Sequence, residues 1–392
     1  MHKKLKRKLE HLQQNGGYRV SRPLAANGFR VSDSSLSEKQ SQELINFSSN
    51  DYLGLTGDAD LQDNFFKQAG VKKSNWMSSS SARPLTGTSP VHAELEASIA
   101  KSYGKNGALL FNSGYHANTG ILPALTDKHD LILADKLVHA SLIDGLSLGQ
   151  ATCKRFAHNN MTHLEQLLTK FSDDFDTVWI VTESVFSMDG DIAPLSELVG
   201  LKQRFNACLY VDEAHAVGSL GQQGLGLVVE QNLEQDVDLI VGTFGKSLAG
   251  YGGFVTGDQL LIDAMINFAR SWLFSTALPP INIDWNLFVW QQLSEFSAQR
   301  QHLNDLTQSF KQQLSDAQEN YLGETYIVPL VKPGNSQVIA LAQALSEQGI
   351  LALPIRSPTV AKGAERIRFS LTANIPEADI QHCVQTLTAI QT

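Results

Sequence analysis

An aspartate and a lysine follow two strand-like runs of the sequence, at the positions where such strands end. Asp212 comes directly after the apolar run 208–211, and Lys246 closes the segment that follows the run 239–242. If these strands are parallel neighbours, a carboxylate and an amine meet in the crevice where open α/β sheets bind ligands. The other interpretation is a buried ion pair, which is an expensive way to fill a core. These two residues alone leave both interpretations open.

Further candidate residues share this position just beyond a predicted strand. They are Gly114, Tyr115, His139, Ser187 and His215. A buried histidine is more often structural than catalytic, but two of them in one crevice favour a function. The backbone at Gly114 also begins a predicted helix, and free N–H groups at a helix start can bind a phosphate.

Together these residue types describe a site for pyridoxal 5'-phosphate. A lysine can hold this cofactor as a Schiff base and is released as an amine when a substrate displaces it. An aspartate keeps the pyridine nitrogen protonated, so that the ring accepts electrons from a carbanion. The sequence therefore predicts a pyridoxal-phosphate enzyme, and it predicts no metal site.

Two short motifs match other enzyme classes but lack the required context. Asp-Glu-Ala-His at 212–215 and Gly-Lys-Ser at 245–247 occur in nucleotide hydrolases, yet a P-loop needs a glycine where this chain has Ile240. Gly-Leu-Ser-Leu-Gly at 145–149 matches a serine-hydrolase motif, which requires a strand directly before the serine. The preceding residues, 139–144, instead predict a loop that runs into a helix. A nucleotide hydrolase and a serine hydrolase are therefore disfavoured.

The elements around these residues alternate between strand and helix. Strands are predicted at 108–111, 131–134, 177–182, 208–211 and 239–242, and helices between them at 90–101, 161–170 and 194–205. Continuous apolar strands that alternate with helices indicate a mostly parallel sheet covered on both faces. The predicted class is α/β, with a smaller C-terminal α+β domain.

Three segments are expected along the chain. Residues 1–45 form an N-terminal helix and linker, 46–280 the large cofactor-binding domain, and 281–392 the small domain. The first helix, 3–14, carries Leu5, Leu9 and Leu12 at helical spacing, and we expect it to dock on its own protein rather than on a membrane. After Pro280 a long Gln-rich helix to 318 is predicted, then strands at 326–331, 350–355 and 366–371 and helices at 336–348 and up to 390.

Composition excludes several other classes. The 392 residues include 31 Lys and Arg against 40 Asp and Glu, a net charge of −9, which disfavours a nucleic-acid binder. The three cysteines are widely spaced, so a disulfide scaffold and a Cys-rich zinc module are excluded. No apolar run approaches the length of a membrane helix, and the basic start at 1–12 lacks the apolar stretch of a secretory signal. A soluble, cytoplasmic protein is expected.

Six motifs occur in the order typical of one enzyme family. They are NFSSNDYLG at 46–54, DKLVHASL at 135–142, RFAHN at 155–159, TESVFSMDGD at 182–191, VDEAH at 211–215 and TFGK at 243–246. With these motifs the chain resembles the α-oxoamine synthases, fold-type I pyridoxal-phosphate enzymes, from about Asn46 to its C-terminus. The resemblance implies that fold, a transferase activity and a homodimer with its active site at the subunit interface.

The resemblance also implies roles around the cofactor ring. Lys246 would hold the cofactor and then remove the α-proton of the amino acid. Asp212 would pair with the pyridine nitrogen, and His215 would hydrogen-bond the phenolic oxygen. His139 would stack on the ring and help to place the substrates, and Ser187 would contact the cofactor.

Four more residues are implied at the phosphate. The amides of Gly114 and Tyr115 and the hydroxyl of Thr243 would bind it within one subunit. Thr276, in the run Phe-Ser-Thr at 274–276, would reach the phosphate of the partner subunit.

The substrates implied are an amino acid and an acyl thioester, joined by decarboxylative Claisen condensation. The member that the chain resembles most joins L-alanine to pimeloyl-CoA or pimeloyl-acyl carrier protein, a step of biotin biosynthesis. Asn50 and Arg356 would bind the amino-acid carboxylate. Arg19 would serve the acyl substrate, with Thr359 near it.

Departures from the family leave alternatives open. The family has glycines where this chain has the serines of 78–81, and only Gly87 is retained, so the acyl specificity could differ. Sister enzymes that use glycine with a short acyl-CoA, and quorum-signal synthases, share the chemistry. A catalytically silent protein with the same fold is the alternative from another class.

Overall fold

The structure is a computed structural model that describes residues 1–33, 43–69, 76–357 and 359–391. The chain forms two compact units, each built from separated segments. One comprises Met1–Asp58, Ser187–Asp191 and Gln301–Thr392, and the other Ala59–Phe186 and Ile192–Arg300. These bounds differ from the three predicted segments, because residues 46–58 and the five residues from Ser187 belong with the C-terminal part. The predicted domains therefore stay a prediction, and residues 34–42 of the predicted linker lie outside the described residues.

The larger unit contains a seven-stranded sheet in the order β4-β10-β9-β8-β7-β5-β6. Its strands are β4 (Gly107–Phe111), β5 (Leu131–Asp135), β6 (Thr152–Phe156), β7 (Val178–Glu183), β8 (Cys208–Asp212), β9 (Leu239–Thr243) and β10 (Gly253–Gly257). β10 runs antiparallel to both neighbours, and the other pairs run parallel. The five strands predicted from apolar runs are all present.

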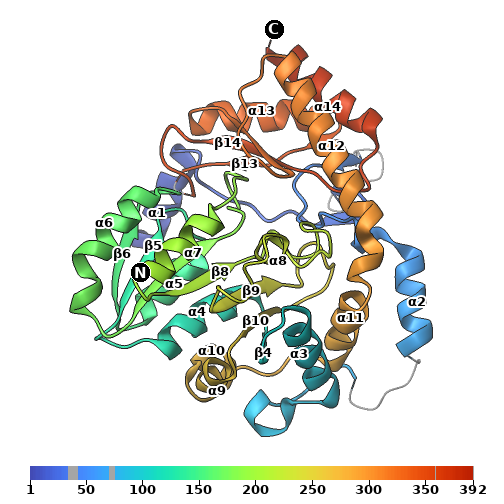
Figure 1. The fold of residues 1–392 in the computed structure, drawn as a ribbon. Helices are drawn as coiled ribbons and strands as arrows, with labels where there is room; N and C mark the ends of the chain where they lie inside the picture. Colours follow the sequence, from blue (N-terminus) through green and yellow to red (C-terminus); the bar gives the residue numbers. More distant parts are fainter. Residues whose placement is uncertain (34–42, 70–75, 358, 392) are drawn as a thin grey trace. The chain divides into compact units, whose positions relative to one another are not determined.

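Helices surround this sheet, as Figure 1 shows. They are α2 (Ala59–Ala69), α3 (Pro90–Ser102), α4 (Gly114–Leu125), α5 (Ala140–Leu148), α6 (Met161–Phe171), α7 (Leu195–Arg204), α8 (Leu227–Glu230), α9 (Gln259–Phe268), α10 (Arg270–Leu273) and α11 (Pro280–Trp290). Short turns of 3-10 or π helix complete it at η2 (Arg83–Gly87), η3 (Ser172–Asp174) and η4 (Leu293–Phe296). The predicted helices 90–101, 161–170 and 194–205 match α3, α6 and α7.

The sequence analysis missed two strands of the larger unit. β6 reads Thr-Cys-Lys-Arg-Phe and is one of the two edge strands; alternate residues of it are exposed, so its apolar run is interrupted. β10 begins and ends with glycine, which lowers its strand propensity although it is fully buried. Both strands are fixed by their neighbours rather than by their own composition.

The smaller unit contains two sheets. One has the order β1-β2-β3-β12 and the other β11-β14-β13. Its elements are α1 (His2–Gln14), β1 (Leu24–Asn27), β2 (Arg30–Asp33), β3 (Leu44–Asn46), η1 (Leu55–Gly57), α12 (Ser297–Asp316), β11 (Ile327–Val331), α13 (Asn335–Glu347), β12 (Ile350–Leu351), β13 (Pro354–Ile355), β14 (Arg366–Ser370) and α14 (Glu377–Gln391). The predicted helix from Pro280 to 318 is wrong as one element, because it breaks into α11, η4 and α12.

The helix predicted at 3–14 exists as α1, but its expected docking on its own protein is wrong. No residue of α1 is buried, and Leu5, Leu9 and Leu12 are 49%, 48% and 38% exposed. The smaller unit holds the residues just after the helix instead, since Asn335 Nδ2 donates to the carbonyl of Asn15 at 2.8 Å. No helix in the described residues is long and apolar enough to cross a membrane.

Candidate active site

A cavity of about 170 Å³ lies in the larger unit, at the carboxyl ends of its parallel strands. Its lining consists of Gly114, Tyr115, Asn118, His139, Ser141, Glu183, Asp212, Ala214, His215, Thr243 and Lys246. Seven of the predicted site residues are therefore brought together, although their positions span 133 residues from 114 to 246 inclusive. Ligands are expected at this edge of such a sheet.

Asp212 is the last residue of β8, and the residue is 5% exposed. Its Oδ2 accepts a hydrogen bond from Asn118 Nδ2 at 2.7 Å, and its Oδ1 accepts one from the backbone N–H of Ala214 at 2.8 Å. Burial of a charge is tolerated when hydrogen bonds of this kind compensate for lost water. The carboxylate is thus held in one orientation at the cavity wall.

A chain of hydrogen bonds connects that carboxylate to His139. Asn118 also donates to Ser141 Oγ at 2.9 Å, and Ser141 Oγ lies 2.7 Å from His139 Nδ1. Because Nδ1 already accepts from the backbone N–H of Ser141 at 3.2 Å, the neutral ring carries its proton on Nε2. The packing around the ring lowers the pKa of His139, and the nearby Asp212 opposes that shift. The neutral form is favoured.

Glu183 is a buried carboxyl group that the sequence analysis did not name as a site residue. It ends β7, is 2% exposed, and pairs in register with Asp212 of β8. Burial raises the pKa of Glu183 well above its ordinary value, and the neighbouring Asp212 raises it further. Glu183 accepts the backbone N–H of His139. It follows a predicted strand just as Asp212 does, so the same rule of strand exits could have found it.

The start of α4 forms the expected phosphate-binding end of the cavity. Ser113 caps the helix by accepting from the N–H of His116, and the described residues supply no acceptor for the N–H groups of Gly114 and Tyr115. Gly253 of β10 passes so close that a Cβ there would lie 2.7 Å from the nitrogen of Gly114. A glycine is therefore required where the strand meets the helix.

Thr243 ends β9, and Lys246 follows it by three residues; both line the cavity. Thr243 Oγ1 donates to the carbonyl of Gly252 at 2.9 Å and accepts from the N–H of Gly245 at 3.2 Å. Thr243 can donate to a phosphate only if its proton turns away from Gly252. Lys246 is half-buried, and its charge acts on both His139 and Glu183. The described residues contain no cluster of three His, Cys, Asp or Glu that could hold a metal.

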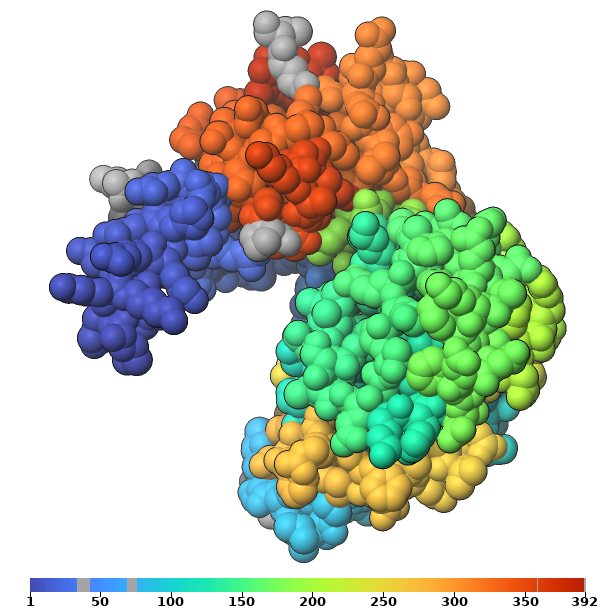
Figure 2. All heavy atoms as spheres, turned by 90° about the vertical axis from the view of Figure 1, so that its left-hand side faces the viewer, coloured from blue at the N-terminus to red at the C-terminus, as the bar shows by residue number. Residues whose placement is uncertain are grey.

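Thr276 does not line this cavity. It is exposed, it forms a bridge with Ala82, and its carbonyl accepts from Asn112 Nδ2 at 2.8 Å. Figure 2 shows the two segments next to each other, residues near 80 in light blue and residues near 270 in gold. Thr276 therefore packs beside the serine-rich segment, in which Ser80 adopts φ +51°.

In the smaller unit, Asn50, which with Arg356 is predicted to bind the amino-acid carboxylate, contacts Arg368. Arg368 is 8% exposed, and its two terminal nitrogens lie 3.3 and 3.4 Å from Asn50 Oδ1. Its Nε donates to the carbonyl of Ser187 at 2.5 Å, which is where the structure places that predicted residue. Among the described residues no carboxylate pairs with Arg368, whereas Arg366 of the same strand pairs with Asp189 at 2.6 Å. The sequence analysis missed Arg368.

Arg356 lies with the two residues predicted for the acyl substrate. Arg19 donates to Thr359 Oγ1 at 2.6 Å, and the guanidinium of Arg356 donates to the carbonyl of Gly16. Burial lowers the pKa of Arg356, and the positive charge of Arg19 lowers it further. Two guanidinium groups thus lie close together, and neither forms an ion pair with a carboxylate of the described residues.

Known proteins share this arrangement over nearly the whole chain. A family model described as aminotransferase class I and II matches residues 42–387. The chain belongs to that family. The 8-amino-7-oxononanoate synthase of Haemophilus ducreyi is 49% identical over 355 residues, which cover 89% of this chain and 92% of the relative.

Solved structures agree with the family assignment. A serine palmitoyltransferase from S. paucimobilis, bound to a PLP–myriocin aldimine, has a TM-score of 0.89 and 28% identity over 98% of this chain and 96% of its own. The 8-amino-7-oxononanoate synthase of Francisella tularensis has a TM-score of 0.73 and 28% identity over 89% of this chain and 98% of its own. The fold is that of a fold-type I pyridoxal-phosphate-dependent transferase, so the predicted fold and family resemblance are confirmed.

The structure also removes one competing motif. Ser147 of the Gly-Leu-Ser-Leu-Gly run lies inside α5, and its hydroxyl donates to the carbonyl of Ile143 at 2.9 Å. A hydrolase nucleophile must lie in a turn between a strand and a helix. Family membership and the position of Ser147 together exclude the hydrolase interpretation.

Proposed function

We propose that this chain joins L-alanine to a pimeloyl thioester, CoA- or carrier-bound, to give 8-amino-7-oxononanoate in biotin biosynthesis, with pyridoxal 5'-phosphate as cofactor. The observation that carries the proposal is the cavity in which Lys246, Asp212 and His139 meet the start of α4. The name of the relatives that share about half of their residues with this chain supplies the product.

The residues around the cavity fit that cofactor. Lys246 offers an amine, Asp212 a fixed carboxylate, and Gly114 and Tyr115 two N–H groups for which the described part of the chain supplies no acceptor. These are the groups that a pyridine ring with an aldehyde and a phosphate requires. His215 lines the same cavity and is proposed to hydrogen-bond the phenolic oxygen.

Bound there, pyridoxal phosphate supplies a covalent link to an amine and a ring that accepts electrons from carbon. Lys246 Nζ anchors the cofactor and, once released, removes the α-proton of alanine. Asp212 holds a proton on the ring nitrogen, since hydrogen bonds from Asn118 and Ala214 fix both of its oxygens. His139 presents Nε2–H as a donor for the substrates.

The atoms of the reaction balance with the two substrates and one proton taken up from solvent. A new bond joins the α-carbon of alanine to the acyl carbon, and the thiol leaves with a proton. The carboxyl group of alanine leaves as carbon dioxide, and a proton replaces it at the same carbon. Lys246 is the group proposed to carry these protons.

We propose that Arg368, rather than the predicted Arg356, binds the carboxylate of alanine together with Asn50. A buried guanidinium without a carboxylate partner among the described residues is costly unless an anion joins it. Asn50 Oδ1 is already engaged by Arg368 and by the hydroxyl of Tyr52 at 3.1 Å, so its amide nitrogen is the group proposed to donate to the carboxylate. Ser187, whose carbonyl accepts from Arg368, is proposed to contact the cofactor.

Arg19, Arg356 and Thr359 are proposed to bind the far carboxylate of the pimeloyl chain. Two adjacent guanidinium groups repel each other, and a carboxylate between them relieves that repulsion. Acyl groups such as acetyl or palmitoyl lack this carboxylate. The pair therefore supports a dicarboxylic acyl donor, pimeloyl or succinyl, over acetyl or palmitoyl, and the thiol-release assay distinguishes the two dicarboxylic donors.

A homodimer with a shared site is proposed because Thr276 has no place in the cavity of its own subunit. Its exposed position beside the serine-rich segment leaves it available to the partner's phosphate. Measurement of mass in solution, with and without the cofactor, tests the dimer directly.

Thiol release by the cofactor-loaded protein tests the proposed reaction. Alanine, glycine and serine are each offered with pimeloyl-, acetyl-, succinyl- and palmitoyl-CoA. Release confined to alanine with pimeloyl-CoA supports the proposal, and release with glycine and a short acyl-CoA moves the chain to a sister enzyme. Silence with every CoA donor but release with pimeloyl-acyl carrier protein assigns the protein-bound donor, and silence with both contradicts the proposal.

A further inference from the structure

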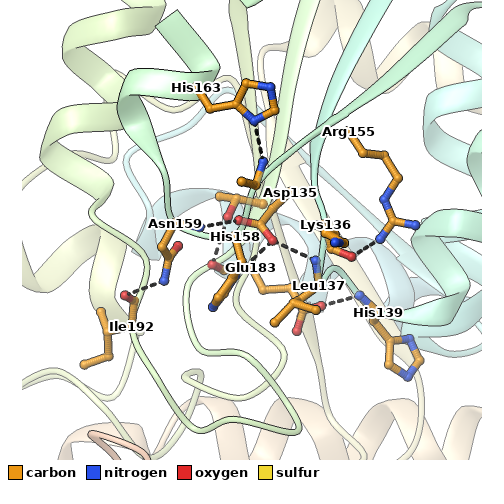
Figure 3. Close-up of polar contacts among 12 residues, drawn as sticks. Asp135, Lys136, Leu137, His139, Arg155, His158, Asn159, His163, Glu183 and Ile192 are labelled. Carbon is orange, nitrogen blue, oxygen red and sulfur yellow. Dashed lines mark hydrogen bonds and ion pairs between the residues drawn. The ribbon is translucent and has the colours of Figure 1, made fainter. Parts of the chain in front are cut away.

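The loop from Lys136 to His139 carries His139 from the end of β5 to the cavity. Side chains from three adjacent strands bind the backbone of this loop, as Figure 3 shows. β5 lies between β7 and β6 in the sheet, so the three strands reach the loop from its base and from either side.

Each strand supplies one contact to a different part of the loop. Asp135 Oδ1 of β5 accepts the N–H of Leu137 at 2.7 Å. Arg155 of β6 donates to the carbonyl of Lys136, and Glu183 of β7 accepts the N–H of His139. The backbone on the N-terminal side of the His139 ring is thus held at three successive points.

Asp135 is the fixed support of this loop. It is 0% exposed, and its Oδ2 accepts the N–H of Asn159 at 2.8 Å. His158 Nδ1 lies 3.0 Å from Oδ1, and the His158 ring packs edge-on against Phe186 at 4.4 Å between centroids. A buried carboxylate with several donors moves little, because any displacement leaves a buried polar group without its partner.

Arg155 and Glu183 differ from Asp135 in what they do for the fold. Arg155 is exposed, so its contact with the loop contributes little to the core. Glu183 is buried at the cavity, where a carboxyl group is costly and an apolar residue would pack more cheaply. Neither residue is explained by stability, and both bind the loop that ends at His139.

We propose that Arg155 and Glu183 are positioning residues that fix the His139 ring in the active site. Asp135 is the fixed support of the loop that they hold. Both act through the backbone of the loop and neither takes part in proton transfer. The inference rests on the proposed role of His139 toward the cofactor. It assigns a part in the reaction to two residues that lie far from Lys246 in the sequence.

The first test replaces Arg155, because its exposure lets the fold survive. Arg155→Ala removes the contact and Arg155→Lys keeps a cationic donor. Arg204→Ala is the matched control, since Arg204 is also exposed, lies in the same unit and pairs with Glu165 at 2.5 Å instead of with the loop. Three readouts are compared: amide hydrogen exchange of residues 136–142 in the apoprotein, visible circular dichroism of the bound cofactor, and kcat and KM for thiol release.

Arg155→Ala is expected to speed exchange in 136–142 by roughly 10-fold, since the loop opens more often without its clamp. The cofactor's dichroism is expected to fall, and kcat to drop on the order of 10-fold with KM changed less, as for other supporting contacts of a site. Arg155→Lys is expected to recover part of each loss. Arg204→Ala is expected to match the unmodified protein in all three readouts.

Glu183 is tested by a pair of substitutions that separate its acceptor from its charge. Glu183→Gln keeps an oxygen for the N–H of His139, and Glu183→Leu removes it at similar volume. Slower exchange at His139 and a higher kcat in Glu183→Gln than in Glu183→Leu support the positioning role. Equal losses in the two variants would show that the carboxyl proton matters and would overturn it.

His139→Ala separates failure of this inference from failure of the proposed function. If His139→Ala leaves the dichroism and kcat unchanged, the proposed role of His139 is wrong. If it changes both while Arg155→Ala behaves like Arg204→Ala, including in hydrogen exchange of the apoprotein, the role of His139 stands and the positioning inference is overturned.

Discussion

Asn118 and Asp212 meet across the larger unit, with Asn118 Nδ2 donating to Asp212 Oδ2 at 2.7 Å. The direction of the amide is fixed, because Tyr210 donates from its hydroxyl to Asn118 Oδ1 at 2.6 Å. Asp212 therefore meets donors on both oxygens, the surroundings that suit a carboxylate acting as an acceptor only. A residue from the first turns of α4 thus fixes the orientation of a carboxylate on β8.

Replacing that carboxylate is expected to weaken cofactor binding. Asp212→Asn keeps the shape but turns an amide donor toward Asn118 or Ala214, and it removes the charge opposite the ring nitrogen. We expect the Kd for pyridoxal phosphate to rise roughly 10- to 100-fold, the effect of losing a charged hydrogen bond. Titration of the apoprotein by visible absorbance measures it, and an unchanged Kd contradicts the ring-nitrogen role.

Lys246→Ala is expected to abolish turnover while the fold survives. The half-buried lysine is the proposed covalent anchor and base, and its loss leaves a gap at the cavity wall rather than in the core. Thiol release and the circular dichroism of the backbone are measured together. Lys128→Ala, at an exposed lysine of the same unit, is the control, and substantial activity of Lys246→Ala would refute the assignment.

Two arginines of the smaller unit are expected to divide the substrates between them. Arg368→Gln should raise the KM for alanine by roughly 10-fold or more and leave the KM for the acyl donor nearly unchanged, because a charge-assisted hydrogen bond is lost. Arg356→Gln should do the reverse. Steady-state kinetics with each substrate varied in turn measures this, and each variant serves as the other's control. A higher alanine KM in Arg356→Gln alone would restore the original prediction.

Ser80→Gly is expected to stabilise the protein. Ser80 is exposed and adopts φ +51°, in the left-handed region where a side chain costs about 1–2 kcal/mol. Part of this gain is offset by the greater freedom of glycine in the unfolded chain, so we expect about 0.5–1 kcal/mol. Thermal melting of the apoprotein measures the effect, with Ser80→Ala as the matched variant that keeps a Cβ. A lower melting temperature for Ser80→Gly would contradict it.

The stability of the protein is expected to depend on pH through Glu213. Burial raises the pKa of this carboxyl group to about 7, while hydrogen bonds from Ser184, Leu227 and Val228 oppose the shift. The folded state therefore binds the proton more tightly than the unfolded state, where the value is 4.5. This contribution is complete below about pH 4.5 and is lost as pH rises through about 7.

Glu213→Gln removes the titration and keeps an oxygen for the N–H groups of Leu227 and Val228. Between pH 5 and 8 the unmodified protein should lose on the order of 3 kcal/mol through this residue, and the variant should not. Urea unfolding at both pH values gives the difference. The free energy of unfolding of the variant, relative to that of the unmodified protein, should therefore be higher at pH 8 than at pH 5. Parallel pH profiles of the two proteins would disprove the contribution of Glu213.

The rule of strand exits accounts for most of what the sequence revealed about the site. Asp212, Lys246 and His139 each follow an apolar run, and the cavity contains all three. Glu183 obeys the same rule, although only Ser187 of its motif was predicted as a site residue. The position of a residue just after a parallel strand therefore predicts this part of the site well.

Other contacts depend on pairings that no local pattern displays. β10 lies antiparallel between β4 and β9, and this insertion is what brings Gly253 against the start of α4. Arg366 and Arg368 occupy equivalent positions on one strand, and a strand pattern cannot tell which of them meets Asp189 and which meets Asn50. The exposure of α1 was likewise hidden, since its leucine spacing is the same whether or not a partner covers it.

The pairing of β3 with β12 has a consequence for folding during synthesis. Ile45 and Asn46 pair with Ile350 and Leu351, so this part of the sheet can form only after β12 has been synthesised. A ribosome that adds about 5–20 residues per second needs on the order of half a minute to supply the missing strand. During that interval the larger unit can fold, while the N-terminal segment of the smaller unit lacks its partner strand. The apolar residues of that segment are therefore the first that the nascent chain exposes to chaperones.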